Sequence, residues 1–123
     1  MTDLRSILVV EDESAARDLV IRMLSEKGFG VLTADNAEDA LSILAERPVD
    51  LLFSDIVLPQ MDGVELAKQA RLLRPGLKVL FATGYAQEAT ERDAKQVGKV
   101  LSKPLNAVEL LKNVRALLAS PRA

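Results

Sequence analysis

The chain of 123 residues contains no cysteine and no histidine. Without cysteine it can form neither a disulfide framework nor a thiolate metal site, which is consistent with a reducing compartment. Without histidine it has no imidazole general base, no Ser/His hydrolase triad and no zinc site of the usual kind. These two absences exclude several large classes of hydrolases and zinc proteins.

Other absences bear on location and partners. No apolar run approaches the ~18 residues of a membrane span, and the polar start at residues 1–5 does not have the pattern of a targeting segment. The net charge is -2 with acids and bases interspersed, so no basic stripe indicates direct contact with nucleic acid. The length fits one hydrophobic core. We therefore expect a single cytoplasmic domain over residues 1–123, with its core at about residues 6–119.

The sequence alternates short apolar runs with helical patterns, which is typical of βαβ units and a parallel sheet. The predicted strands cover residues 7–10, 31–34, 49–53, 79–82 and 99–101. The predicted helices run from a Ser14 cap to a stop at Gly28, from Asn36 to before Pro48, over residues 63–73, over residues 87–96, and from a capping pair at Asn106 and Glu109 to Leu118. The helix at 87–96 is the weakest, because its apolar residues are two alanines among charges.

Chemically active side chains follow the predicted strands. Glu11 and Asp12 follow the first strand, Asp55 follows the third, Thr83 ends the fourth and Lys103 follows the fifth. In a doubly wound α/β sheet of order 2-1-3-4-5, all of them converge on the crevice beside strands one and three. Two unit charges about 4 Å apart repel by roughly 4 kcal/mol at an effective dielectric near 20, so three carboxylates together indicate a bound cation. Oxygen ligands of this kind suit Mg²⁺.

A metal-binding carboxylate beside a lysine and a hydroxyl is typical of phosphoryl transfer. The cation and the ammonium neutralise phosphoryl oxygens, and the hydroxyl donates a hydrogen bond to one of them. Asp55 is the expected nucleophile, because carboxylates form aspartyl-phosphates. We assign no chemistry to Asp62-Gly63, which is interpreted as a turn and helix start.

Together these residues resemble the response-regulator receiver domains of two-component signalling, over about residues 6–119. The resemblance rests on five segments: Glu11-Asp12, residues 55–59 (DIVLP), Asp62-Gly63, Thr83-Gly84 and Lys103-Pro104. It implies a flavodoxin-like (CheY-like) three-layer sandwich in a bacterial signalling protein that works through an aspartyl phosphate.

The resemblance also implies roles for individual residues. Asp55 would accept a phosphoryl group from a sensor histidine kinase or phosphotransfer protein. Mg²⁺ would be bound by Glu11 or Asp12, by Asp55, and by the backbone carbonyl of Val57. Thr83 and Lys103 would contact the phosphoryl group, and a cis Lys103-Pro104 bond would aim the lysine into the site. Beyond self-phosphorylation we expect only slow loss of the phosphoryl group, not turnover of a substrate.

Two features concern the switch and the subgroup. Many receivers carry an aromatic residue three positions before the lysine, where this chain has Val100, so we hypothesise that Tyr85 or the weak fourth helix takes over the conformational readout. Residues 81–85 (FATGY) resemble the signature of the FAT GUY single-domain regulators of alphaproteobacterial stress signalling. Similar strings occur in hybrid-kinase receivers, and Lys78-Val79 departs from the Pro-Phe lead-in of the former group. Both subgroups remain open.

Other functions fit the residues less well. A flavodoxin-like cofactor binder needs a loop after strand one that cradles phosphate, whereas residues 11–13 are all acidic. Phosphatases resembling the haloacid dehalogenase group carry a second aspartate two positions after the nucleophile, where this chain has Val57. A degenerate receiver that acts as a constitutive binding module is an alternative. Output is expected through protein contact, on the face of strands four and five with helices four and five.

Overall fold

The computed structural model describes residues 5–84 and 88–119 as five strands alternating with five helices. The strands are β1 (Ser6–Val10), β2 (Gly30–Ala34), β3 (Leu51–Asp55), β4 (Lys78–Thr83) and β5 (Lys99–Ser102). The helices are α1 (Ser14–Ser25), α2 (Ala37–Glu46), α3 (Gly63–Leu73), α4 (Glu88–Val97) and α5 (Ala107–Leu118). The strands pair in parallel in the order β2-β1-β3-β4-β5, which confirms the predicted doubly wound sheet.

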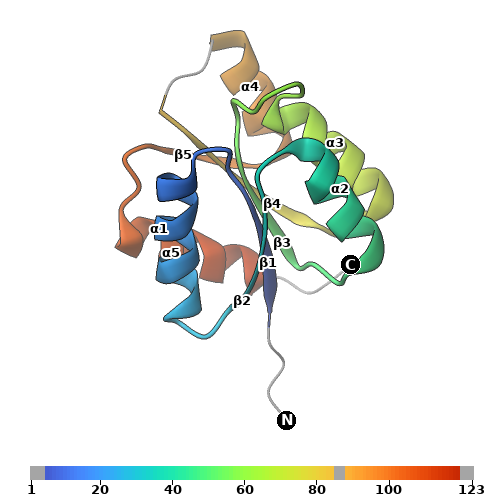
Figure 1. Cartoon of the computed structure of the whole chain (residues 1–123). Helices are drawn as coiled ribbons and strands as arrows, with labels where there is room; N and C mark the ends of the chain where they lie inside the picture. Colours follow the sequence, from blue (N-terminus) through green and yellow to red (C-terminus); the bar gives the residue numbers. More distant parts are fainter. Residues whose placement is uncertain (1–4, 85–87, 120–123) are drawn as a thin grey trace.

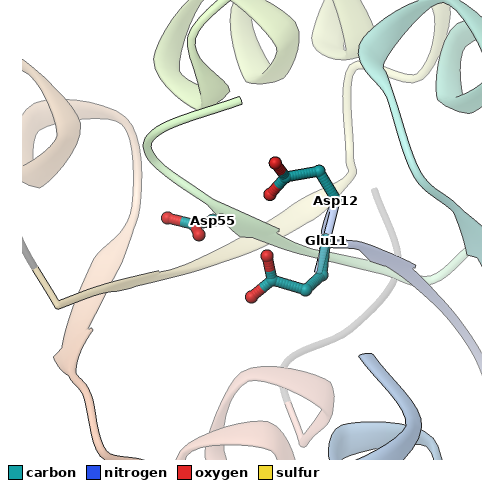
Figure 2. A group of neighbouring side chains, drawn as sticks. All are labelled: Glu11, Asp12 and Asp55. Carbon is teal, nitrogen blue, oxygen red and sulfur yellow. The ribbon is translucent and has the colours of Figure 1, made fainter. Parts of the chain in front are cut away.

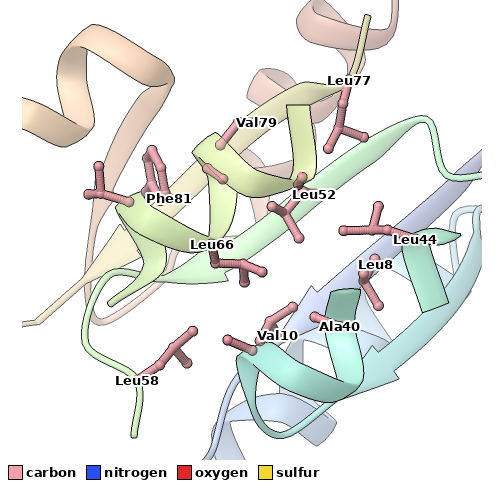
Figure 3. Packing of buried hydrophobic residues seen from close by; sticks show 14 of the residues in the cluster. Leu8, Val10, Ala40, Leu44, Leu52, Leu58, Leu66, Leu77, Val79 and Phe81 are labelled. Carbon is pink, nitrogen blue, oxygen red and sulfur yellow. The ribbon is translucent and has the colours of Figure 1, made fainter. Parts of the chain in front are cut away.

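Helices cover both faces of the sheet, so the fold has three layers (Figure 1). Alternate residues of each strand point to opposite faces. Leu8 and Val10 of β1 therefore pack with α2, α3 and α4, whereas Ile7 and Val9 pack with α1 and α5. Figure 3 shows the first of these cores, in which Phe81 and Val79 of β4 pack beside residues of β1 and β3. Strands covered on both faces explain the nearly continuous apolar runs of the sequence.

Most predicted element boundaries are confirmed. Gly28 follows α1 with φ +90°, a left-handed conformation that glycine adopts without steric cost. Asn36 caps α2 by accepting a hydrogen bond from the Asp39 amide, and Asn106 caps α5 by accepting one from the Glu109 amide. Within the described residues no helix has the length and apolar character needed to cross a membrane.

Two boundary predictions are wrong. The third strand covers Leu51–Asp55 rather than residues 49–53, because its ladder with β1 begins at Ile7 opposite Leu51 and its ladder with β4 extends to Asp55 opposite Ala82. Ser14 is the first helical residue of α1 rather than its cap. Glu13 holds the cap position without a side-chain hydrogen bond, and its carbonyl accepts the Arg17 amide.

The C-terminal half of the fourth helix packs against the rest of the fold. Ala94 is fully buried there, and Val97 packs against the same core. Arg71 of α3 donates from Nη1 to the Val97 carbonyl at 2.7 Å and from Nε to the Leu77 carbonyl. The predicted fourth helix is therefore confirmed, with its end at Val97 rather than at residue 96.

Candidate functional site

The three predicted carboxylates meet at the carboxyl edge of the sheet. Glu11 and Asp12 lie where β1 ends, and Asp55 is the last residue of β3 (Figure 2). One carboxylate oxygen from each residue lies within 4.8 Å of the others. Glu11 is buried and Asp12 is exposed, so the cluster extends from the protein interior to the surface. This geometry confirms that the sequence places three acids together.

Lys103 connects two of these carboxylates. Its Nζ atom lies 2.5 Å from Glu11 Oε1 and 2.9 Å from Asp55 Oδ2. The Lys103-Pro104 peptide bond is cis, as predicted. The backbone amide of Lys103 also donates to the Thr83 carbonyl at 2.9 Å, which ties the end of β5 to the end of β4. Glu11, Asp12, Asp55, Thr83 and Lys103 therefore all lie at one edge of the sheet.

The electrostatics of the site are those of a crowded acidic cluster with one ammonium. Burial is the largest influence on Glu11 and raises its pKa; the charge of Asp55 adds to this, and contacts with Lys103 only partly offset it. For Lys103, burial alone would lower the pKa. Hydrogen bonds and charge attraction from Glu11 and Asp55 outweigh burial, and the net pKa is raised. Three carboxylates and one ammonium leave the site with excess negative charge, which a divalent cation would balance.

The Thr83 hydroxyl is a buried polar group with a free donor. Thr83 is 8% exposed, and among the described residues its Oγ1 atom has no hydrogen-bond partner. Leaving such a group unpaired costs about 1–3 kcal/mol. Together with the hard oxygen ligands of the acidic cluster, this hydroxyl fits a site that holds Mg²⁺ and an oxyanion.

Gly63 positions the start of α3 against the end of β3, a role that the sequence did not indicate. A Cβ atom built at Gly63 would lie 2.1 Å from the backbone oxygen of Asp55, far closer than real Cβ contacts. The Gly63 amide donates to the Ile56 carbonyl at 2.7 Å, so α3 begins directly against the end of β3. Asp62 caps α3 by accepting a hydrogen bond from the Glu65 amide, which confirms the helix start predicted at Asp62-Gly63. Glycine is therefore required here by the close approach of two backbones.

The remaining predicted positions have mixed outcomes. The Val57 side chain is 54% exposed and its amide donates to Asp55 Oδ1 at 3.1 Å; metal contact by its carbonyl stays a prediction. Val100 is half-buried opposite Phe81 and packs against the core beneath α4. Tyr85 lies outside the described residues.

Comparison with known proteins identifies the class of domain that this fold and site define. The family model for the response regulator receiver domain matches residues 7–115. The chain belongs to this family, whose members serve as phosphoacceptors in two-component signalling.

Three similar proteins show which kinds of protein carry such a domain. It is 38% identical over 117 residues to the response regulator receiver protein CpdR of Brucella abortus (strain 2308), covering 94% of this chain and 98% of CpdR. It is 36% identical to the sensor kinase CckA of the same organism, covering 92% of this chain but only 12% of the kinase. A CheY-like receiver structure from Methanospirillum hungatei JF-1 superposes with a TM-score of 0.89, at 33% identity and 95% coverage of each chain. Single-domain regulators and hybrid kinases therefore both carry similar receivers.

Proposed function

We propose that Asp55 is the phosphoacceptor of this receiver domain, and that Glu11, Asp12, Asp55 and the backbone carbonyl of Val57 hold Mg²⁺. One observation carries the proposal: the ammonium of Lys103 contacts Asp55 within a three-acid cluster. A lysine that served only to neutralise one surface carboxylate would not be accompanied by two further acids and by a buried, unpaired hydroxyl at the end of the adjacent strand. When bound, Mg²⁺ would supply positive charge to the oxygens of the transferred group.

The side chains of the site divide the remaining work. Both oxygens of Asp55 are oriented, Oδ1 by the Val57 amide and Oδ2 by Lys103. One of them attacks the phosphorus of the donor; the bond from phosphorus to the donor's leaving atom breaks, and its electron pair departs with that atom. Lys103 and the Thr83 hydroxyl then contact the oxygens of the phosphoryl group. Without a histidine, the site has no imidazole base to activate water for hydrolysis, so the proposal includes slow loss of the phosphoryl group rather than turnover.

The donor in this proposal is a sensor histidine kinase or a phosphotransfer protein. The output surface comprises β4, β5, α4 and α5. The Lys103 amide and Thr83 carbonyl support this choice, because they join the site directly to the ends of β4 and β5. The readout then works with Val100 in place of an aromatic residue, through Tyr85 or through movement of α4. The cytoplasmic location stays a prediction.

The second candidate is the receiver of a hybrid kinase. The similarity to a segment that makes up 12% of the CckA kinase favours it specifically. It shares the chemistry proposed for Asp55 and differs in the partner that supplies or receives the phosphoryl group. The degenerate binding module is disfavoured, because Glu11, Asp55 and Lys103 are all present and in contact.

Intact mass spectrometry after incubation with acetyl phosphate tests the proposal. The wild type should gain one phosphoryl group only when Mg²⁺ is present, and Asp55→Ala should gain none. Asp62→Asn is the matched control, because asparagine retains the oxygen that caps α3. Phosphorylation of Asp55→Ala to the wild-type level would show that another residue is the acceptor.

A further inference from the structure

The loop between β1 and α1, residues 11–13, supplies two of the three carboxylates, and an arginine from α1 holds its backbone. Arg17 donates from Nη1 to the backbone carbonyl of Glu11 at 2.8 Å. Arg17 is half-buried and lies one turn before Val20 on the stripe of α1 that, with Leu24, packs on the sheet. The guanidinium therefore links a helix fixed on the core to the start of the acidic loop.

Each polar group of Glu11 has a partner. Its amide donates to the Ala34 carbonyl of β2, its carboxylate contacts Lys103 and accepts the Glu13 amide at 3.4 Å, and its carbonyl accepts the Arg17 guanidinium. The contacts of the amide and the carboxylate fix the strand and the side chain. The contact of the carbonyl fixes the peptide group between Glu11 and Asp12, and because that group is planar it also restricts the direction in which Asp12 leaves the strand.

Asp12 depends on this backbone contact more than Glu11 or Asp55 does. Its side chain is exposed, and in the part of the chain that the structure describes its carboxylate accepts no hydrogen bond. Glu11 and Asp55, by contrast, are both held by Lys103. The position of the Asp12 carboxylate beside the other two, which Figure 2 shows, is therefore set by its main chain.

We propose that Arg17 is a positioning residue for the Mg²⁺ site: by fixing the Glu11 carbonyl, it holds the Asp12 carboxylate where it can bind the ion with Asp55. The inference rests on the proposed function, because it takes these carboxylates as the ligands. Arg17 acts through the backbone of the loop and is itself no ligand, since a guanidinium has no lone pair to offer.

Positioning and simple charge predict opposite effects on Mg²⁺ affinity. A guanidinium near a cation site repels the cation, so if only charge mattered, removing it would tighten Mg²⁺ binding. If Arg17 positions Asp12, removing it loosens a ligand and weakens binding. Lysine retains the charge but lacks the planar fork that holds a carbonyl in a fixed direction, so Arg17→Lys separates the two effects.

The experiment is a titration of metal-free protein with Mg²⁺, followed by ¹H–¹⁵N NMR, for the wild type, Arg17→Met and Arg17→Lys. Arg22→Met is the matched control, because Arg22 is an exposed arginine on the same helix. Thermal melts in chelator report the stability of each variant separately. We expect Arg17→Met to bind Mg²⁺ about tenfold more weakly, the lower end of the effect of losing an outer-shell partner of a metal ligand. Arg17→Lys should also bind more weakly, and Arg22→Met should bind as the wild type does.

Three other outcomes would overturn the inference. Tighter binding by Arg17→Met with wild-type binding by Arg17→Lys would show that only charge matters. Equal affinity in all four proteins would show that the loop holds Asp12 without Arg17. If the wild type bound no Mg²⁺, the proposed metal site would fail first and the inference with it. If Arg17→Met did not fold, the comparison between Arg17→Lys and the wild type would decide.

Discussion

Removing the Asp12 carboxylate should stabilise the protein in chelator and destabilise it in Mg²⁺. Asp12 lies within 4.8 Å of carboxylate oxygens of Glu11 and Asp55. At that distance each pair repels by about 0.9 kcal/mol in bulk water and about 3.5 kcal/mol at an effective dielectric of 20. Because Asp12 is exposed, the value near the water limit applies, and attraction to Lys103 reduces it further.

The net gain in stability for Asp12→Ala without metal is therefore on the order of 1 kcal/mol. For a domain of this size, that corresponds to a rise of about 3–5 °C in the melting temperature. In saturating Mg²⁺ the Asp12→Ala protein should instead be less stable than the wild type. A ligand at a hundred times its dissociation constant stabilises the native state by about 2.7 kcal/mol, and the variant should lose most of that gain.

The assay is a pair of thermal melts for each protein, one in chelator and one in saturating Mg²⁺. Asp93→Ala serves as the control, because Asp93 is an exposed acid on α4 that lies outside the three-acid cluster. An Asp12→Ala protein that melts below the wild type in chelator, or that gains as much from Mg²⁺ as the wild type does, would refute this account of the cluster. Asp55→Asn should gain less in chelator than Asp12→Ala, because it also loses the ion pair with Lys103.

Three further predictions concern other parts of the structure. Gly63→Ala should lose about 1–3 kcal/mol of stability, because the added methyl group overpacks against the Asp55 carbonyl. Its phosphorylation rate should fall by up to about a hundredfold, because the acceptor is displaced. A Gly63→Ala protein that melts and is phosphorylated as the wild type does would contradict the close contact. The pKa of Glu11 in the folded protein is raised above 4.5. In chelator, the stability that this raised pKa contributes is therefore present below pH 4.5 and is lost as the pH rises through the folded pKa. The melting temperature of Glu11→Gln minus that of the wild type should therefore become more positive from about pH 4.5 upwards. A difference in melting temperature that does not vary with pH would be evidence against the raised pKa. Arg74→Met should lower the free energy of unfolding by about 2 kcal/mol in chemical denaturation, because Arg74 donates to two backbone carbonyls at the C-terminal end of α2. Its phosphorylation should stay unchanged. A loss below about 0.5 kcal/mol would mean that water replaces those bonds.

The strand ends explain why most of the site could be predicted from the sequence. Glu11, Asp12, Thr83 and Lys103 each lie at or just after the end of a short apolar run, and parallel topology brings such ends to one edge. That prediction needed only the order of the strands. The two-residue error at β3 had no effect on it, because Asp55 remained at the same edge as the last residue of the strand.

The supporting residues were harder to predict because tertiary packing defines their roles. In sequence Gly63 is one glycine after an aspartate, and the need for it appears only when α3 is seen against the carbonyl of Asp55. Arg17 and Arg71 read as ordinary charged helix residues. Their guanidinium groups turn inward to backbone carbonyls, and no periodic pattern distinguishes them from arginines that remain in solvent.

The most direct test of the central claim is chemical identification of the phosphorylated residue. Protein incubated with acetyl phosphate and Mg²⁺ would be reduced with borohydride, which converts an aspartyl phosphate to homoserine, and then sequenced by tandem mass spectrometry. The account predicts homoserine at position 55 and at no other position, and none when Mg²⁺ is replaced by chelator. Conversion at Asp12 or Asp62, with position 55 intact, would contradict it.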